Sequence, residues 1–171
     1  MIAQSDIAVA VFLAEHPDAT YEHIAVALSI SLSTAHTGVG RLRESQLMLP
    51  DGRRVNRTAL IELLEHGVRY IFPAAPGRLT LGVPTAHSGP VLSDLIRADE
   101  QYVWRSSHGS VRGYAITPLI PAAGELAKRS PDTYAALSLV DALRVGRSRE
   151  RALAGEALRE RFRMPRERSV Y

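Results

Sequence analysis

Residues 20–48 carry the pattern that most constrains the fold, because they predict two short helices joined by a tight turn. Thr20 is a good N-cap residue, and apolar residues follow it at helical spacing. Ser29-Ile30 breaks this spacing, and Ser31 is a second N-cap that opens another apolar stripe. The residues expected to be buried are Ile24, Ala25 and Leu28 in the first helix and Leu32, Ala35, Val39 and Leu42 in the second.

The opposite face of the second helix carries short hydrogen-bonding side chains, one long cation and almost no acid. A helix in the major groove of DNA needs donors and acceptors for base edges and no negative charge beside phosphates. This face therefore indicates nucleic-acid binding. Gly38 and Gly40 also lie inside the helix, and each costs about 1 kcal/mol of helix stability relative to alanine. The polar face consists of Ser33, Thr34, His36, Thr37, Gly40 and Arg41.

This segment resembles the winged helix-turn-helix domain of bacterial transcriptional regulators, the MarR-like group in particular. The resemblance rests on Ser33-Thr34-Ala35-His36, Val39, Arg41-Leu42-Arg43-Glu44 and Gln46-Leu47-Met48. It covers residues 5–66, over a third of the chain. It implies an N-terminal DNA-binding domain whose second motif helix reads the DNA sequence.

A short wing is expected after this helix. Leu47-Met48-Leu49 has strand character, Pro50-Asp51-Gly52-Arg53 is typical of a turn, and Arg54-Val55 begins a return strand. Arginines on such a wing would contact phosphate or the minor groove, and phosphate contacts give affinity without sequence information. The residues expected to bind DNA are Ser31, Ser33, Thr34, His36, Thr37, Arg41, Arg43, Arg53, Arg54 and Arg57.

The composition agrees with this interpretation. The formal net charge is +3, and Lys128 is the one lysine among 21 basic residues. Arginine suits planar contacts to phosphate and base edges, although a GC-rich genome would produce the same bias. The chain has no cysteine, which excludes disulfides, thiolate zinc sites and cysteine nucleophiles.

The N-terminal segment predicts an amphipathic helix over about residues 5–16, beginning at Ser5 or Asp6. It lacks the basic region of a signal peptide. No run of apolar residues in the chain is long enough to span a membrane. We therefore expect a cytoplasmic protein, and the resemblance implies a bacterial one.

The expected fold class is α+β, with a domain boundary after residue 66. Asn56 predicts the cap of a helix over 57–66, and Gly67 is a suitable C-cap. Residues 1–66 would form the winged helix-turn-helix domain. Residues 67–171 would form a small α+β domain that ends in two helices and dimerises, binds an effector or holds a protein partner.

Strand character in this second part appears at 68–72 and 79–82, within a region rich in proline and glycine. Residues 101–105 and 111–116 alternate well enough to predict a hairpin. Trp104, the single tryptophan, is expected to anchor the second core.

Helices are expected to return near the C-terminus. A short one is predicted over 121–129, and Ser130-Pro131-Asp132 is a strong start signal for a helix that stops at Gly146. Ser148 would cap the last helix. The polar tail after Met164 is expected to fray.

The helix over about 131–145 is apolar on most of its surface and therefore requires burial on nearly all sides. We expect a homodimer with this helix and the helix over 149–162 as the interface. The alternative is a monomer in which the hairpin around Trp104 covers one side and the last helix the other.

No catalytic, cofactor-binding or metal-binding site is expected, and the chain is not predicted to be an enzyme. None of the six histidines forms a metal-ligand pattern. His87 and Ser88 are adjacent and point to different sides of an extended chain, so they make a poor catalytic pair. Residues 82–90 are interpreted as a rigid packing loop. Arginine and glutamate alternate after Arg144, which predicts a solvated helix face with i, i+4 pairs, or a second surface for nucleic acid or an acidic partner.

These observations predict a sequence-specific transcriptional regulator that binds double-stranded DNA. Two alternatives stay open. Similar winged-helix domains act as autorepressing antitoxins that are paired with a nucleotidyltransferase-like toxin encoded alongside. The chain could instead be an adaptor that uses its winged helix for protein contacts and does not bind DNA.

Overall fold

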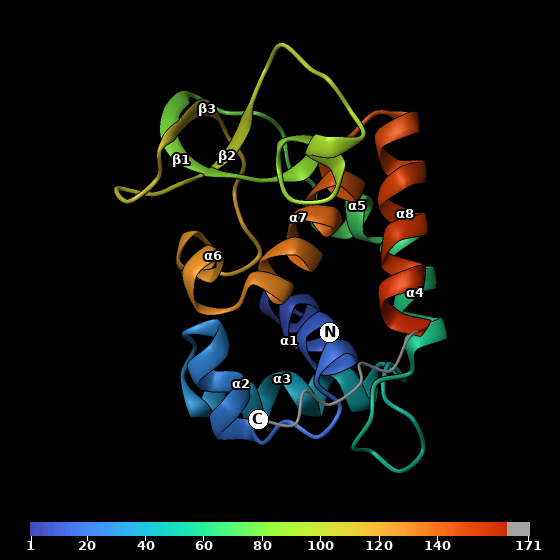
Figure 1. The fold of residues 1–171 in the computed structure, drawn as a ribbon. Helices are drawn as coiled ribbons and strands as arrows, with labels where there is room; N and C mark the ends of the chain where they lie inside the picture. Colours follow the sequence, from blue (N-terminus) through green and yellow to red (C-terminus); the bar gives the residue numbers. More distant parts are fainter. Residues whose placement is uncertain (164–171) are drawn as a thin grey trace, which may run out of the picture.

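The computed structural model describes residues 1–163, so the tail predicted to fray lies outside the described residues. Helix α1 (Gln4–Glu15) is buried on all sides, and the prediction of an amphipathic helix was wrong. Its residues from 7 to 14 are all apolar, and a helix without a polar face is buried. Helices α2, α3, α7 and α8 pack around it (Figure 1). Asp6 accepts a hydrogen bond from the Ala3 backbone at 2.7 Å, so the helix begins one residue before the predicted start.

The two predicted motif helices are present as α2 (Tyr21–Leu28) and α3 (Leu32–Glu44). Thr20 and Ser31 cap them as predicted, each accepting a backbone N–H of the first turn. Ser29 ends α2 in the left-handed conformation, with φ of 52°. Leu32, which was predicted to be buried, is 44% exposed at the first position of α3. The buried face of α3 is therefore formed by Ala35, Gly38, Val39 and Leu42.

Helix α4 (Arg57–His66) follows the predicted bounds, and Asn56 caps it. The strand predicted over 68–72 is instead a short helix, α5 (Val68–Ile71). Val68 is fully buried, and α5 packs against α7, whereas Tyr70 and Ile71 are exposed. Packing of this one turn therefore overrides the strand propensity of its residues.

The sheet is a small closed barrel of three strands. Of the four strands predicted after residue 66, the three that follow 68–72 are present, but the hairpin pairing was wrong. The second and third strands both run antiparallel to the first, and hence parallel to each other. The strands are β1 (Leu79–Pro84), β2 (Tyr102–Arg105) and β3 (Val111–Ala115).

Glycines permit the tight closure of this barrel. Gly82 pairs with both neighbouring strands, and a Cβ there would lie 2.1 Å from the Trp104 carbonyl oxygen. A Cβ on Gly109 would lie 2.2 Å from the carbonyl carbon of Gly82. A side chain at either position would therefore force the strands apart.

Short 3-10 turns connect the remaining elements. They are η1 (Ala86–Ser88), η2 (Leu92–Asp94) and η3 (Ala123–Glu125), and the last leads into α6 (Leu126–Arg129). The C-terminal helices are α7 (Pro131–Val145) and α8 (Ser148–Arg163). Ser148 is the first residue of α8 rather than its cap.

Helix α7 is covered within its own chain. It is packed against η1, α1, α5, α6 and α8, and eleven of its residues are buried. Trp104 is also buried, as predicted. The apolar circumference of α7 is thus no longer an argument for a dimer.

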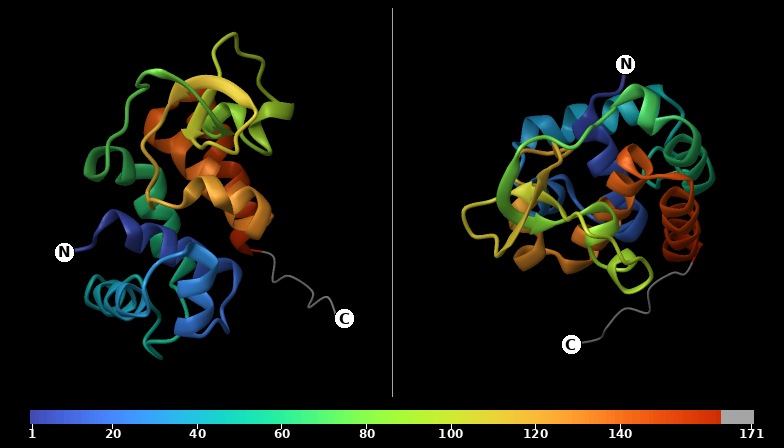
Figure 2. Two further views of the ribbon diagram at one scale, coloured as in Figure 1. Left: turned by 90° about the vertical axis from the view of Figure 1, so that its left-hand side faces the viewer. Right: turned by 90° about the horizontal axis from the view of Figure 1, so that it is seen from above.

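One hydrophobic core runs through the molecule. It joins α1, α3 and α4 with Trp104, α7 and α8, so the boundary predicted after residue 66 is not a break in the core. Figure 2 shows α1 and α7 close together, between the end of the molecule that holds α2 and α3 and the end that holds the barrel. Among residues 1–163, no helix has the length and apolar character needed to cross a membrane.

A buried carboxylate on α7 ties the barrel to this core. Asp141 accepts hydrogen bonds from Thr85 Oγ1 at 2.8 Å, from Trp104 Nε1 at 2.6 Å and from Arg144 Nη1 at 2.8 Å. Arg144 in turn donates to the carbonyl oxygens of Phe72 and Thr117. Burial raises the pKa of Asp141, and the three donors oppose that rise.

We expect Asp141→Asn to lower the free energy of unfolding by about 3–5 kcal/mol, because it leaves Arg144 buried without a counter-charge. Urea denaturation measures this change. Asp94→Asn is the matched control, since Asp94 is exposed. A loss below about 1 kcal/mol for Asp141→Asn, the size of an ordinary neutral hydrogen bond, would contradict the role of the pair.

Candidate nucleic-acid interface

The polar face of α3 is open to solvent over most of its length. Ser33, His36 and Thr37 are exposed, as is Ser31 at the cap. Thr34 is half-buried, and its hydroxyl lies 2.7 Å from the Ser31 hydroxyl. The structure thus brings these five predicted residues together on one surface. The acid of α3 is Glu44, at its last position.

The His36 ring is held in place by a neighbour that sequence reasoning missed. It stacks on Tyr21 of α2, with ring centroids 3.7 Å apart and an angle of 23° between the planes. Tyr21 follows the cap of α2, and only the packing of α2 on α3 reveals its contact. The imidazole is therefore presented in one orientation beside Thr37.

Arg41 is turned toward the protein core. Its Nε and Nη2 atoms donate to the two Asp6 carboxylate oxygens at 2.6 and 2.8 Å. Asp6 is fully buried, whereas the Arg41 side chain is 26% exposed. The hydrogen bond with Asp6 raises the pKa of Arg41. The structure therefore places Arg41 in an ion pair between α1 and α3 and not with the exposed residues of the polar face.

Gly38 makes room for this ion pair. A Cβ at Gly38 would lie 3.0 Å from Asp6 Oδ1, so a larger residue would displace the carboxylate. The first of the two helix-weakening glycines is thus explained by close packing. A Cβ at Gly40 would meet open space, and nothing in the structure explains that glycine.

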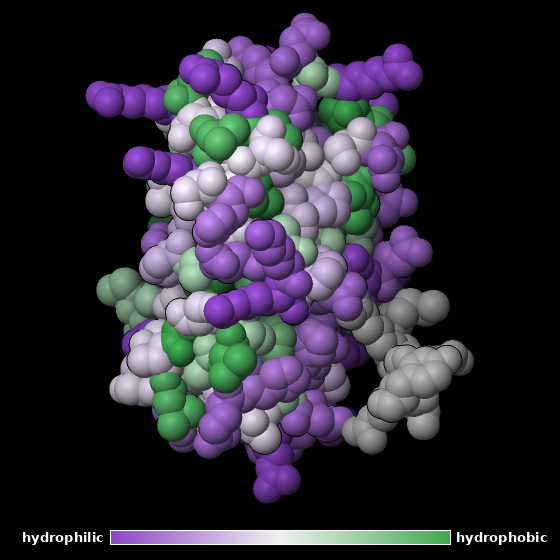
Figure 3. Space-filling view, turned by 60° about the vertical axis from the view of Figure 1, so that its left-hand side comes forward, coloured by the Kyte–Doolittle hydropathy of each residue, from purple (hydrophilic) through white to green (hydrophobic). Residues whose placement is uncertain are grey.

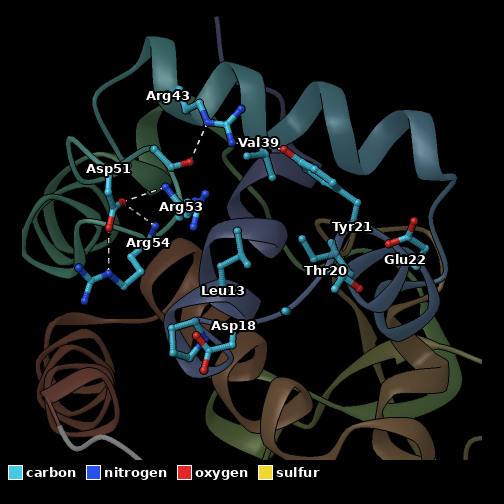
Figure 4. A pocket seen from close by; sticks show the side chains of 14 residues that line it. Leu13, Asp18, Thr20, Tyr21, Glu22, Val39, Arg43, Asp51, Arg53 and Arg54 are labelled. Carbon is cyan, nitrogen blue, oxygen red and sulfur yellow. Dashed lines mark hydrogen bonds and ion pairs between the residues drawn. The ribbon is translucent and has the colours of Figure 1, made fainter.

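A short hairpin follows α3 at the predicted place. Met48 and Val55 form an isolated antiparallel bridge, and Leu49 N donates to the Arg54 carbonyl at 2.7 Å. Arg43 fixes this hairpin to the helix, because its Nε donates to the Gly52 carbonyl at 2.8 Å. Its Nη2 lies 3.3 Å from the Tyr21 hydroxyl (Figure 4). Arg43 is still exposed.

The hairpin turn is organised by Asp51. Its carboxylate accepts the backbone N–H groups of Arg53 and Arg54 and pairs with Arg54 Nε at 3.0 Å. These bonds lower the pKa of Asp51 to about 2. Arg54 is thus partly neutralised, whereas the Arg53 side chain is exposed. Of the predicted wing cations, Arg53 is the one most open to a phosphate.

Arg57 is drawn away from the α3 face. Its Nη2 donates to the Ala14 carbonyl at 2.9 Å, at the C-terminal end of α1. A cation there satisfies a free helix carbonyl and opposes the negative end of the helix dipole. The structure thus gives Arg57 a bond that joins α4 to α1.

A cavity of about 700 Å³ lies between the hairpin and helices α1, α2 and α3 (Figure 4). Leu13, Ile24 and Val39 line it with buried apolar side chains. Charged residues of both signs surround them: Arg43, Arg53, Arg54, Asp18, Glu22 and Asp51.

Within residues 1–163, two of the C-terminal arginines pair with carboxylates of other helices and not with carboxylates of α8. Arg166 and Arg168, which belong to the same predicted pattern, lie outside the described residues. Arg159 pairs with Glu65 of α4 at 2.6 Å, and Arg161 pairs with Glu15 of α1 at 2.8 Å. These pairs join α8 to other helices instead of following its own face.

The segment 82–90, which was interpreted as a packing loop, is partly regular structure, because residues 82–84 end β1 and residues 86–88 form η1. Thr85, His87 and Ser88 are buried, and His87 Nε2 lies 2.7 Å from the Glu100 carbonyl oxygen. The Ser88 hydroxyl accepts the Tyr102 N–H at 2.9 Å. Among residues 1–163, no three His, Asp or Glu side chains converge as a metal site would require.

Comparison with known proteins assigns no family to this arrangement. No protein-family model, no curated protein and no solved structure matches the chain.

We expect Arg41→Ala to lower the free energy of unfolding by about 3 kcal/mol, because Asp6 would stay buried without its cation. Thermal and urea unfolding measure this loss. Arg53→Ala is the matched control and should change stability by less than about 0.5 kcal/mol, as for other exposed sites. If Arg41→Ala instead kept the stability of the parent and lost only DNA binding, the result would support the predicted contact between Arg41 and DNA.

Proposed function

We propose that this protein is a sequence-specific DNA-binding transcriptional regulator of the winged helix-turn-helix type. The observation that carries the proposal is the exposed surface of α3, where Ser33, His36 and Thr37 present donors and acceptors without a neighbouring acid on that face. Such groups read base edges in the major groove. Glu44, the acidic residue of α3 that would be repelled by phosphate, lies at the last position of the helix.

The fixed position of the hairpin supports the same proposal. Arg43 joins α3 to Gly52, so helix and hairpin form one surface (Figure 4). A helix that enters the groove would bring the Arg53 side chain close to the phosphate backbone. Phosphate contacts of this kind set the register, and the helix supplies specificity.

The alternative of an adaptor that binds protein through the same surface makes an opposite prediction. A DNA-binding surface loses affinity steeply with added salt because counterions are released from phosphate. Absence of binding to any duplex at low salt would favour the adaptor. The antitoxin alternative requires DNA binding as well, together with a toxic neighbouring gene that this protein neutralises.

We expect Thr37→Ala to relax base preference at one or two positions and to cost about 1–3 kcal/mol of specific binding. Sites selected by the parent protein from randomised duplexes provide the operator for this measurement. Thr58→Ala, an exposed threonine on α4, is the control. If the parent enriches no sequence, the proposed specificity fails.

We expect Arg53→Ala to weaken binding to all duplexes by a similar factor. The slope of log K against log salt should fall by about 0.9, as for one lost phosphate contact. Arg97→Ala, which removes an exposed arginine elsewhere, should leave the slope unchanged. A loss confined to one DNA sequence would show that Arg53 reads a base.

A further inference from the structure

Tyr21 contacts α3 at two points that are about two turns of helix apart. Its ring stacks on the His36 imidazole, with the ring centroids 3.7 Å apart. Its hydroxyl accepts a hydrogen bond from Arg43 Nη2 at 3.3 Å. The Tyr21 side chain lies along α3, with its hydroxyl toward Arg43 (Figure 4). One residue of α2 thus contacts both a candidate base-reading side chain and the end of the same helix.

The far end of the Tyr21 side chain is itself held in place. Arg43, which donates to the hydroxyl, also donates from Nε to the Gly52 carbonyl oxygen at 2.8 Å. Consecutive contacts therefore connect His36 through Tyr21 and Arg43 to the hairpin turn. The ring on which the imidazole stacks is anchored at both ends, by the backbone of α2 and by Arg43.

Tyrosine meets two requirements at this position. Tyr21 is half-buried and follows the cap of α2, so an aliphatic residue would cover the same part of the core. The stack on His36 requires a flat ring, and the bond from Arg43 requires an acceptor at the far end of the side chain. Phenylalanine would supply the ring alone and leucine neither, so the two roles can be separated by substitution.

The stacked pair lies at an end of the molecule whose surface has mixed polarity. In the space-filling view, hydrophobic side chains lie between hydrophilic ones toward the end that holds α2 and α3 (Figure 3). Val26 of α2 and Leu32 of α3 are 71% and 44% exposed. Aliphatic side chains form no hydrogen bonds with base edges, so readout would fall to the few polar side chains of α3. The orientation of each of these side chains therefore matters for the choice of base.

We propose that Tyr21 is a positioning residue for sequence readout, an inference that rests on the proposed DNA-binding function. Its ring holds the exposed His36 imidazole in the orientation from which the imidazole nitrogens reach a base edge. Ordering a side chain on binding costs part of the affinity, and a side chain that is ordered in advance avoids this cost. His36 then sets one base position of the operator, and Tyr21 acts on that position through His36.

Two measurements on the full chain test the proposal, one with DNA and one without it. Affinity for the selected operator and for its single-base variants is measured for the parent, Tyr21→Leu, Tyr21→Phe, His36→Ala and the double variant Tyr21→Leu/His36→Ala. Tyr70→Leu is the matched control, because Tyr70 is an exposed tyrosine of α5. Without DNA, proton NMR records the His36 ring signals, which a stacked tyrosine ring shifts upfield. Thermal unfolding checks that each variant is folded.

The His36 ring signals should be shifted upfield in the parent and in Tyr21→Phe, but not in Tyr21→Leu. Tyr21→Leu should lower the base preference at the position read by His36 by about three- to tenfold, and Tyr21→Phe by less than about twofold. The double variant should lose no more preference there than His36→Ala alone, because the two residues act as one unit. Tyr70→Leu should change neither measurement.

Unshifted His36 signals in the parent would overturn the positioning role, whether or not the protein binds DNA. Unchanged preference in Tyr21→Leu, an equal loss in Tyr21→Phe, or a loss spread evenly over all base positions would also overturn it. If the parent selects no DNA sequence although its His36 signals are shifted, the proposed regulator fails, and with it the readout role of Tyr21.

Discussion

The Asp141–Arg144 pair is the interaction on which the placement of the barrel depends. A sheet of only three short strands depends for its stability on a hydrophobic face or on packing against a helix. Thr85, Trp104, Phe72 and Thr117 instead bond to this one turn of α7. Because a buried ion pair costs desolvation, its value lies less in stability than in fixing one arrangement of these segments.

The same physical device sets the candidate DNA-binding surface. Asp6 is buried at the start of α1, and the cation that compensates it comes from α3. Since Gly38 and Arg41 both contact Asp6, the rotation of α3 about its axis is fixed. That rotation decides that Ser33, His36 and Thr37 are the residues exposed. The buried Asp6–Arg41 pair thus determines which residues of α3 form the candidate DNA-binding surface.

Local signals in the sequence predicted much of this fold. Thr20, Ser31 and Asn56 cap helices because their side chains bond to backbone groups within three residues, and such geometry requires no tertiary information. Nonlocal features were missed. Helical periodicity located Arg41 near the polar face but could not supply its partner 35 positions away. The available signal was Asp6 itself, an acid directly before the apolar run 7–14. Likewise, alternation predicted β2 and β3, but their common pairing with β1 depends on Gly82.

Coverage of α7 by its own chain changes how two DNA half-sites would be read. One α3 helix reaches one half-site, and two-fold sites require two such helices about one helical turn apart. The fully packed α7 offers no free face for pairing copies. If two copies were joined through another surface, α3 would still supply specificity, and the link would set the effective concentration of the second α3 at its half-site.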